Sequence, residues 1–179
     1  MPRVFIAVDL PQPVRDRLAM LRGGIPGARW VPPENYHLTL KFLGEIDHGA
    51  IEDVIAALAD LVMPGFAVAI DGVGHFGTER KPSVLFARVA RSDLLQRLHD
   101  KVDRATVAAG LPPDDRKFAP HVTLAYLRQA NIARLARWQQ ENNLLRVPDI
   151  PVARVDVVES HTGGEASHYV SLAEIPLLA

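Results

Sequence analysis

Hydrophobic and polar residues alternate along this chain in short blocks that predict strands and helices in turn. Residues 4–8 form an apolar, β-branched run, which is typical of a buried strand. Pro13 then opens a helical pattern, because apolar residues recur three and four positions apart up to a Gly23-Gly24 stop. The next three blocks predict a strand, a helix and a strand, over residues 37–43, about 50–62 and 66–73.

The same order of elements then begins again. Residues 84–89 predict a strand, and Ser92 is a good N-cap for a helix that ends at Gly110. A strand, a helix and a strand follow, over residues 121–127, about 132–142 and 150–158. A last strand over residues 169–175 has no counterpart in the first series.

The two series are in register with each other. Their first strands start 80 positions apart, and their second and third strands start 84 positions apart. An ordinary α/β sheet predicts no such matched spacing. The sequence therefore predicts a single α+β domain over residues 1–179. Its repeats, approximately 1–78 and 79–179, should form two lobes related by a pseudo-twofold axis.

Composition narrows the choice of partner and chemistry. The chain has 179 residues, 48% of them hydrophobic, which is enough for one well-buried domain. The net charge of -1 argues against a strongly basic surface, so any nucleic acid must be bound locally. The absence of cysteine excludes disulfides and thiolate chemistry. Nothing resembles a signal peptide or an apolar span of about 20 residues, so we expect a cytoplasmic protein without membrane contact.

Two histidines occupy matched places in the repeat. The second strand of each series begins with the same pattern, HLTL from His37 and HVTL from His121. With seven histidines and five threonines in 179 residues, chance would give about 0.2 His-x-Thr triplets. One such triplet is ordinarily structural, but two at equivalent points of a repeat indicate a shared function.

Strand geometry predicts which side chains face the site. Side chains alternate along a strand, so His37, Thr39 and Lys41 should share one face, as should His121 and Thr123. Near neutral pH one imidazole can take a proton from water while the other gives a proton to a leaving oxygen. The threonine hydroxyls can bond phosphate oxygens, and Lys41 can add positive charge. The pattern therefore predicts attack on a phosphodiester, with a bell-shaped rate profile near neutral pH.

Other hydrolytic chemistries have weaker support. Metal sites for hydrolysis typically use three protein ligands, often with a carboxylate, and neither strand offers Asp or Glu on the histidine face. No Gly-x-Ser-x-Gly pattern indicates acyl transfer by a serine. We therefore expect a reaction that needs no metal and no cofactor.

The two motifs and their flanks resemble the two-histidine (2H) phosphoesterases. Within them, the chain is similar to the bacterial and archaeal RNA 2′,3′-cyclic phosphodiesterases, also called 2′-5′ RNA ligases. The segments that carry the resemblance are RVFIAVDL (3–10), RWV (29–31), EN (34–35), HLTLKFLG (37–44) and FAPHVTL (118–124), with Tyr169 before the last strand. The resemblance covers nearly the whole chain.

This resemblance implies a bilobal fold of mainly antiparallel sheet, with helices outside and a central groove that holds no metal or cofactor. The implied reaction is hydrolysis of an RNA 2′,3′-cyclic phosphate end to a 2′-phosphate, with reversible 2′-5′ ligation as a related activity in RNA processing. By the same analogy His37 is the proton donor and His121 the proton acceptor. The implied partner is RNA with a cyclic phosphate end, or a small cyclic nucleotide, and we expect a monomer.

One position departs from the pattern of many relatives, which carry an arginine three residues after the second threonine. This chain has Tyr126 there, and the next arginine is Arg128. Strict alternation from His121 puts both on the opposite face, so either can reach the phosphate only through a bulge or a strand end. Lys41, Arg80 and Lys81 are the other candidates for the neutralising charge.

Three aromatic residues are candidates for stacking on a nucleobase, namely Phe5, Tyr126 and Tyr169. Two rival hypotheses stay open. The same chemistry could act on linear 2′-5′ oligonucleotides or on small cyclic nucleotides. Alternatively, a non-catalytic module could bind the terminal phosphate of RNA without turnover, and the absence of an arginine at position 126 favours that reading.

Overall fold

The computed structural model describes the whole chain, residues 1–179, as strands and helices in alternation. The strands are β1 (Arg3–Asp9), β2 (Arg29–Trp30), β3 (His37–Glu45), β4 (Phe66–Gly77), β5 (Pro82–Val89), β6 (His121–Tyr126), β7 (Arg146–Val152), β8 (Arg154–His161) and β9 (His168–Pro176). The helices are α1 (Gln12–Ala19), α2 (His48–Ala59), α3 (Asp93–Ala108) and α4 (Ile132–Asn142), with a short 3-10 helix η1 (Pro33–Asn35). The predicted α+β class is confirmed.

All the strands belong to one antiparallel sheet, in the order β7-β4-β5-β6-β3-β1-β8-β9, with β2 paired to β6. Strand β4 comes from the first half of the sequence but pairs with β5 from the second half. Conversely, β8 comes from the second half but pairs with β1. Each side of the sheet therefore contains strands from both halves of the sequence, and one continuous cluster of buried apolar residues spans them.

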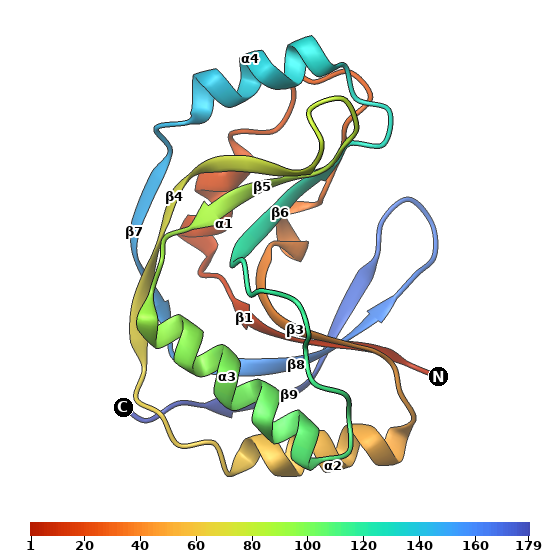
Figure 1. Cartoon of the computed structure of the whole chain (residues 1–179), viewed down its shortest axis with the longest axis vertical. Helices are drawn as coiled ribbons and strands as arrows, with labels where there is room; N and C mark the ends of the chain where they lie inside the picture. Colours follow the sequence, from red (N-terminus) through yellow and green to blue (C-terminus); the bar gives the residue numbers. More distant parts are fainter.

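Helices α2 and α3 lie at one end of the molecule and α4 lies at the other, with α1 nearer the middle (Figure 1). At one end α2 and α3 pack together, α3 beside β3 and α2 beside β9. At the other end α4 lies beside β4, and Trp138 Nε1 donates a hydrogen bond to the Leu21 carbonyl oxygen, just after α1. Ser92 caps α3 as predicted, because its hydroxyl accepts a hydrogen bond from the Leu95 N–H at 3.1 Å. None of the helices has the length and apolar character needed to cross a bilayer.

One predicted strand is wrong. Residues 150–158 read as a single strand, but the chain divides there at Ala153 into β7 and β8. Strand β7 pairs with β4 at one edge of the sheet, whereas β8 pairs with β1 on the other side. The apolar pattern runs on across the break because both strands bury their inward residues, Ile150, Val152, Val155 and Val157. The pattern of apolar residues cannot show that the chain ends one strand here and begins another with a different partner.

The two strands that carry the His-x-Thr triplets, β3 and β6, meet at the centre of the sheet. They pair antiparallel at Leu38 and Val122. These residues are the spacers of the two triplets, so their pairing relates one triplet to the other by an approximate twofold rotation. An antiparallel register through this pair sets each histidine across from the threonine of the other strand.

A β-bulge follows the threonine in each of these strands. In β3 the register with β1 skips Leu40, and in β6 the register with β5 skips Leu124. Alternation therefore shifts by one residue beyond each bulge. In β3 the shift turns Lys41 toward the core together with Leu40, and returns Phe42 to the face that carries the histidine.

The expectation that Lys41 shares the face of the histidine is therefore wrong. Lys41 is 4% exposed, and its Nζ donates hydrogen bonds to Asp103 Oδ1 at 2.7 Å, Thr106 Oγ1 at 2.7 Å and the Pro112 carbonyl oxygen at 2.8 Å. Burial opposes the charge on Asp103. The hydrogen bonds from Lys41 and from the Asp114 N–H nevertheless bring the pKa of that carboxyl below its usual value.

The ion pair between buried Lys41 and partly buried Asp103 anchors residues 111–120, a segment without regular secondary structure that leads into His121. Lys41 holds the segment through Pro112, as does Asp103 through the Asp114 N–H at 2.9 Å. Farther along, the Phe118 ring stacks on His99 with 4.2 Å between ring centroids. Lys41 thus stabilises the segment that leads into His121, and its charge does not face the cavity.

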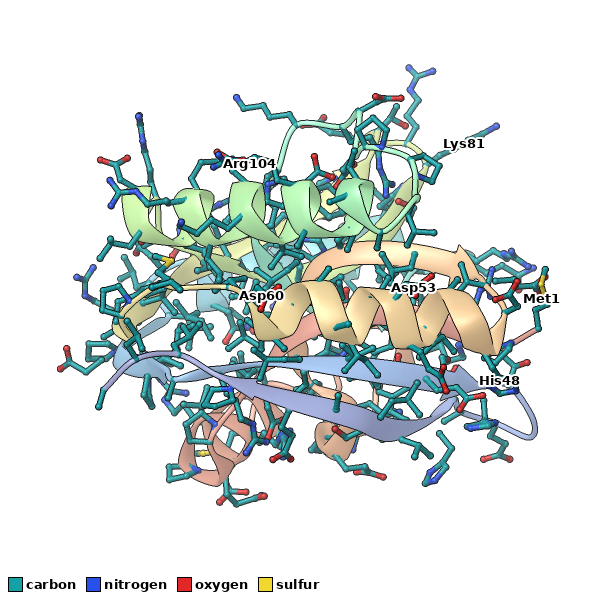
Figure 2. All side chains as sticks on the ribbon, turned by 90° about the horizontal axis from the view of Figure 1, so that it is seen from below. Met1, His48, Asp53, Asp60, Lys81 and Arg104 are labelled. Carbon is teal, nitrogen blue, oxygen red and sulfur yellow. The ribbon has the colours of Figure 1, made fainter.

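Replacing Lys41 by Met should lower the free energy of unfolding by about 1.5–3 kcal/mol, the scale of a hydrogen bond to a charged group. The substitution keeps most of the apolar stem but leaves Asp103, Thr106 and the Pro112 carbonyl without their shared donor. Urea unfolding measures the change. Lys81→Met is the control, because Lys81 points outward from the β4–β5 turn (Figure 2) and should change stability by less than about 0.5 kcal/mol. Equal effects of the two substitutions would contradict the role of the buried pair.

Candidate active site

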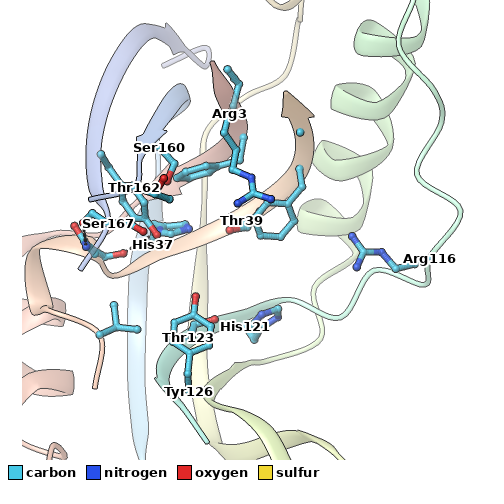
Figure 3. Close-up of a pocket in the computed structure, with 17 residues that line it drawn as sticks. Arg3, His37, Thr39, Arg116, His121, Thr123, Tyr126, Ser160, Thr162 and Ser167 are labelled. Carbon is cyan, nitrogen blue, oxygen red and sulfur yellow. Dashed lines mark hydrogen bonds between the residues drawn. The ribbon is translucent and has the colours of Figure 1, made fainter. Parts of the chain in front are cut away.

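The two triplets face a cavity of about 420 Å³ at the centre of the molecule. His37 and Thr39 enter it from β3, and His121 and Thr123 enter it from β6 (Figure 3). The remaining walls come from β1, from the segments around the site and from the β8–β9 hairpin. They are lined by Arg3, Val4, Phe5, Val31, Asn35, Phe42, Gly44, Arg116, Tyr126, Ser160, Thr162, Ser167 and Tyr169.

Both imidazoles are held by the same kind of hydrogen bond. His37 Nδ1 lies 2.7 Å from the Asn35 carbonyl oxygen, and His121 Nδ1 lies 2.7 Å from the Ala119 carbonyl oxygen. A carbonyl oxygen only accepts hydrogen bonds, so Nδ1 must carry the proton in each ring. Nε2 is then the ring nitrogen that can exchange a proton with a molecule in the cavity. The sequence repeat thus extends to the carbonyl two residues before each histidine.

Burial favours the neutral form of both histidines. It lowers the pKa of His37 from 6.5 to about 4, and the nearby His121 adds to this shift, whereas the bond to the Asn35 carbonyl opposes it. Burial also lowers the pKa of His121, against the opposing bond to the Ala119 carbonyl. An anionic phosphate in the cavity would shift both pKa values upward, because a nearby negative charge favours the imidazolium.

Aromatic rings enclose each imidazole and account for its burial. Phe5 stacks on His37 with 4.7 Å between ring centroids, and Tyr169 meets the same ring edge-on at 5.3 Å. On the other side the ring centroids of Phe76 and Phe86 lie 4.8 and 5.4 Å from that of His121. Phe5 is only 4% exposed, so its ring packs against the histidine rather than presenting an open face to a nucleobase. Tyr169 is half-buried, and burial raises the pKa of its hydroxyl.

The positive charge in the cavity comes from residues that the sequence did not single out as cations of the site. Arg3 lines it from β1, and Arg116 lines it from the segment that leads into β6 (Figure 3). Arg3 could have been found from the pattern, because it precedes Phe5 by two residues and so shares its face of β1. Arg116 could not, because it lies in the irregular segment 111–120. Its place depends on how the Lys41 cluster holds that segment.

The other cations named from the sequence do not line the cavity. Arg80 and Lys81 are exposed in the turn between β4 and β5, and Arg128 is exposed in the turn after β6. Lys41 lies on the core side of β3. Alternation alone could not locate these side chains. Residues in turns do not alternate between the faces of a strand, and the bulge in β3 places Lys41 on the core side.

Tyr126 reaches the cavity because of the bulge in β6. It is 41% exposed, and the Arg29 guanidinium lies 5.1 Å from the centroid of its ring. Phe42, which is 60% exposed, occupies the matching place after the bulge in β3, 84 positions earlier. Because His37 and His121 are also 84 positions apart, the repeat in the sequence pointed to Phe42 as the equivalent of Tyr126. Strict alternation along the strand instead assigned Phe42 to the face opposite the histidine. The cavity therefore has an exposed ring from each of its two central strands.

Neutral polar groups complete the wall near His37. The side chain of Asn35 is buried, and its Nδ2 donates to the Ser167 carbonyl oxygen at 2.7 Å. This bond ties the β8–β9 hairpin to the residue whose own carbonyl orients His37. The hairpin in turn brings the hydroxyls of Ser160, Thr162 and Ser167 to the cavity (Figure 3). A hairpin loop gives no periodic signal, so these hydroxyls could be located only in three dimensions.

The cavity is suited to an anion. Its walls contain two imidazoles, two guanidinium groups and several hydroxyls, and no carboxylate. Nowhere in the structure do three His, Cys, Asp or Glu side chains come together in a group that could hold a metal ion. Guanidinium and hydroxyl groups donate hydrogen bonds to phosphate oxygens. Two opposed imidazoles with free Nε2 atoms in such a cavity define a phosphoesterase of the two-histidine class.

Comparison with known proteins agrees with this class. The family model described as LigT like Phosphoesterase matches the chain twice, over residues 8–86 and 89–166. These matches cover most of the chain, one on each half of the sequence. The protein belongs to the LigT-like phosphoesterase family and is an enzyme of that family.

Curated relatives are similar to the chain over two thirds or more of its length. The RNA 2′,3′-cyclic phosphodiesterase of Aeropyrum pernix is 30% identical over 166 residues, which cover 89% of this chain and 94% of the relative. The protein of the same name from Thermus thermophilus is 38% identical over 136 residues, which cover 69% of this chain and 67% of the relative.

Solved structures show the same fold. TT0787 of Thermus thermophilus matches with a TM-score of 0.79 at 27% identity and covers 97% of both chains. LigT of E. coli in its apo form matches with a TM-score of 0.77 at 22% identity and covers 99% of both chains. The continuous antiparallel sheet with its four helices is therefore the fold of the family.

The lowered pKa values of the two partly buried histidines predict an acidic optimum for kcat/KM, below pH 6.5. Acid–base catalysis by the pair needs one proton shared between them, and that state is most populated midway between their two pKa values. Both values lie below 6.5 in the free enzyme, and the pKa of His37 is about 4. The optimum therefore moves below the neutral pH expected from ordinary histidines. The profile of kcat should lie at higher pH, because bound phosphate raises both pKa values.

The measurement is kcat/KM and kcat against pH on one cyclic phosphate substrate. Titration of His37 by NMR in the free protein gives the pKa independently of turnover. An optimum of kcat/KM at or above neutral pH would contradict the effect of burial on the two histidines.

Proposed function

We propose that the protein hydrolyses 2′,3′-cyclic phosphate ends of RNA to 2′-phosphates without a metal ion. The observation that carries this proposal is the pair of opposed imidazoles, each fixed through Nδ1 by a carbonyl and each with Nε2 available in one cavity. The names of the curated relatives, RNA 2′,3′-cyclic phosphodiesterases, support the choice of substrate.

In the proposed reaction a water oxygen attacks phosphorus, and the bond from phosphorus to the ribose 3′ oxygen breaks. His121 Nε2 takes the proton from the water, and His37 Nε2 gives a proton to the departing 3′ oxygen. The products are a 2′-phosphate monoester and a free 3′-hydroxyl. The approximate twofold relation between the histidines makes the site nearly symmetric, so the assignment of donor and acceptor rests on the resemblance to the family.

The other cavity residues complete the proposed transition-state contacts. Thr39 and Thr123 can donate their hydroxyl protons to the non-bridging oxygens, one from each central strand. Arg3 and Arg116 can neutralise the charge that grows on the phosphate, in place of the arginine that many relatives carry at the position of Tyr126. The absence of an arginine at position 126 favoured a non-catalytic role. In the proposed mechanism Arg3 and Arg116 supply the positive charge instead.

The exposed rings suggest how the terminal nucleoside is held. Tyr126 and Phe42 present open aromatic surface at the cavity, one from β6 and one from β3. A nucleobase can stack on such a ring without regard to its sequence. We therefore propose base stacking on these two residues, with Tyr169 and Phe5 packed around His37. Reversible 2′-5′ ligation, the monomeric state and the cytoplasmic location stay predictions.

His37→Ala and His121→Ala should each reduce kcat/KM by about 10²–10⁴-fold, the scale of general acid–base catalysis. Thr39→Ala and Thr123→Ala should cost less, because each removes one hydrogen bond to the phosphate. The substrates are a nucleoside 2′,3′-cyclic monophosphate and a short RNA with the same end, with separation of 2′- from 3′-phosphate products. His48→Ala is the matched control, because His48 is exposed on α2 (Figure 2) and does not line the cavity.

The same assay with an excess of chelator tests the metal-independent mechanism. Wild-type activity should persist, since the cavity offers two imidazoles and no carboxylate as metal ligands. Loss of activity on chelation, restored by adding a divalent metal, would overturn the mechanism. Absence of turnover of both substrates would favour a role in binding RNA ends.

A further inference from the structure

A second cleft, of about 550 Å³, lies beside His121. Three residues that line this cleft also contact the imidazole. The Phe76 and Phe86 rings pack against it at 4.8 and 5.4 Å, and the Ala119 carbonyl accepts its hydrogen bond. The cleft therefore begins at the proposed catalytic base and extends away from the central cavity.

The lining of this cleft is rich in unpaired positive charge. It contains Arg88, Arg91 and Lys117, all exposed, and one acid, Asp93. None of the three cations forms an ion pair in the structure. Cations on concave walls that include apolar surface attract anions more strongly than cations scattered over a convex surface. The protein as a whole carries a net charge of -1, so this charge is a local feature.

The backbone of β4 makes room for one of these cations. A Cβ atom at Gly74 would lie 2.9 Å from Arg88 Nη2 and 2.8 Å from Phe86 Cζ. Both side chains thus lie over the glycine, and a larger residue at position 74 would require them to shift. The glycine keeps the Arg88 guanidinium beside the ring that contacts His121.

The cleft on the other side of the site has the opposite character. It lies beside His37 and is lined by four acids and two bases, Asp9, Glu34, Asp156, Glu174, Arg15 and Arg154. Both bases are neutralised by ion pairs. Arg15 binds Asp9, and Arg154 binds Asp9, Asp156 and Glu174. The two sides of a nearly twofold site therefore differ in charge, and a polyanion is favoured on the side of His121.

We propose that the cleft beside His121 binds the sugar–phosphate backbone of single-stranded RNA whose end reacts in the central cavity. The identity of this ligand rests on the proposed function. Arg116 and Lys117 are neighbours in the chain, the first lining the cavity and the second the cleft, so one continuous strand can pass from one to the other. Phosphates contact the unpaired cations, and the partly exposed Phe76 offers a ring to a base.

The test is equilibrium binding of a fluorescent RNA hexamer that ends in a 2′-phosphate, with the nucleoside 2′-monophosphate as competitor. Binding is measured rather than turnover, so the result stands whether or not the protein hydrolyses the cyclic end. The hexamer should bind wild type about tenfold more tightly than the mononucleotide at low salt, as expected for two or three phosphate contacts. Its affinity should also fall more steeply with salt.

The double variant Arg91→Gln/Lys117→Gln should lose most of this preference for the hexamer. Its slope of log affinity against log salt should flatten by about 1.4, since each lost phosphate contact on a single strand accounts for about 0.7. The matched control is Arg97→Gln/Arg104→Gln, which removes the same charge from exposed positions of α3 outside the cleft. The control should keep both the preference and the slope.

Two results would overturn the inference. One is equal affinity and equal salt dependence of the hexamer and the mononucleotide on wild type, which needs no variant. The other is an equal effect of the two double variants, which would show a general charge effect. Failure of the proposed function would instead appear as absence of turnover in the cyclic phosphate assay, with the binding result unaffected.

Discussion

The pairing of β3 with β6 at Leu38 and Val122 is the constraint on which the rest of the site depends. These residues are the spacers of two equivalent triplets, so their antiparallel pairing places the triplets in a nearly twofold relation at the centre of one sheet. Each histidine then lies across from the threonine of the other strand. Because the two strands share few backbone pairs, the sheet opens here and leaves a cavity between them.

Burial gives this arrangement its chemical character. Rings from β1 and β9 enclose His37, and rings from β4 and β5 enclose His121. This enclosure disfavours the imidazolium in the free protein and lowers both pKa values. Carbonyl oxygens hold Nδ1 in both rings, so the exchangeable nitrogen is the same on each side. An anionic phosphate bound in the cavity would favour the protonated state of one histidine.

The symmetry of the site is limited to its centre. Beyond the triplets the two sides differ in charge, with paired acids and bases beside His37 and unpaired cations beside His121. The Lys41–Asp103 pair holds the segment 111–120 in place. The repeat thus supplies the two matched imidazoles, while Arg116 and the unequal charge of the two clefts do not follow its symmetry.

The sequence by itself determined the α+β class, the repeat and the two histidine–threonine pairs, because alternation and spacing are local properties of the chain. It also contained the signal for Phe42, through its offset from Tyr126. Only the tertiary structure decided that residues 150–158 divide between two sides of the sheet, that Lys41 is buried and that Arg116 faces the cavity. Strand partners and bulges depend on hydrogen bonds between distant segments, and a bulge reverses every later residue of its strand.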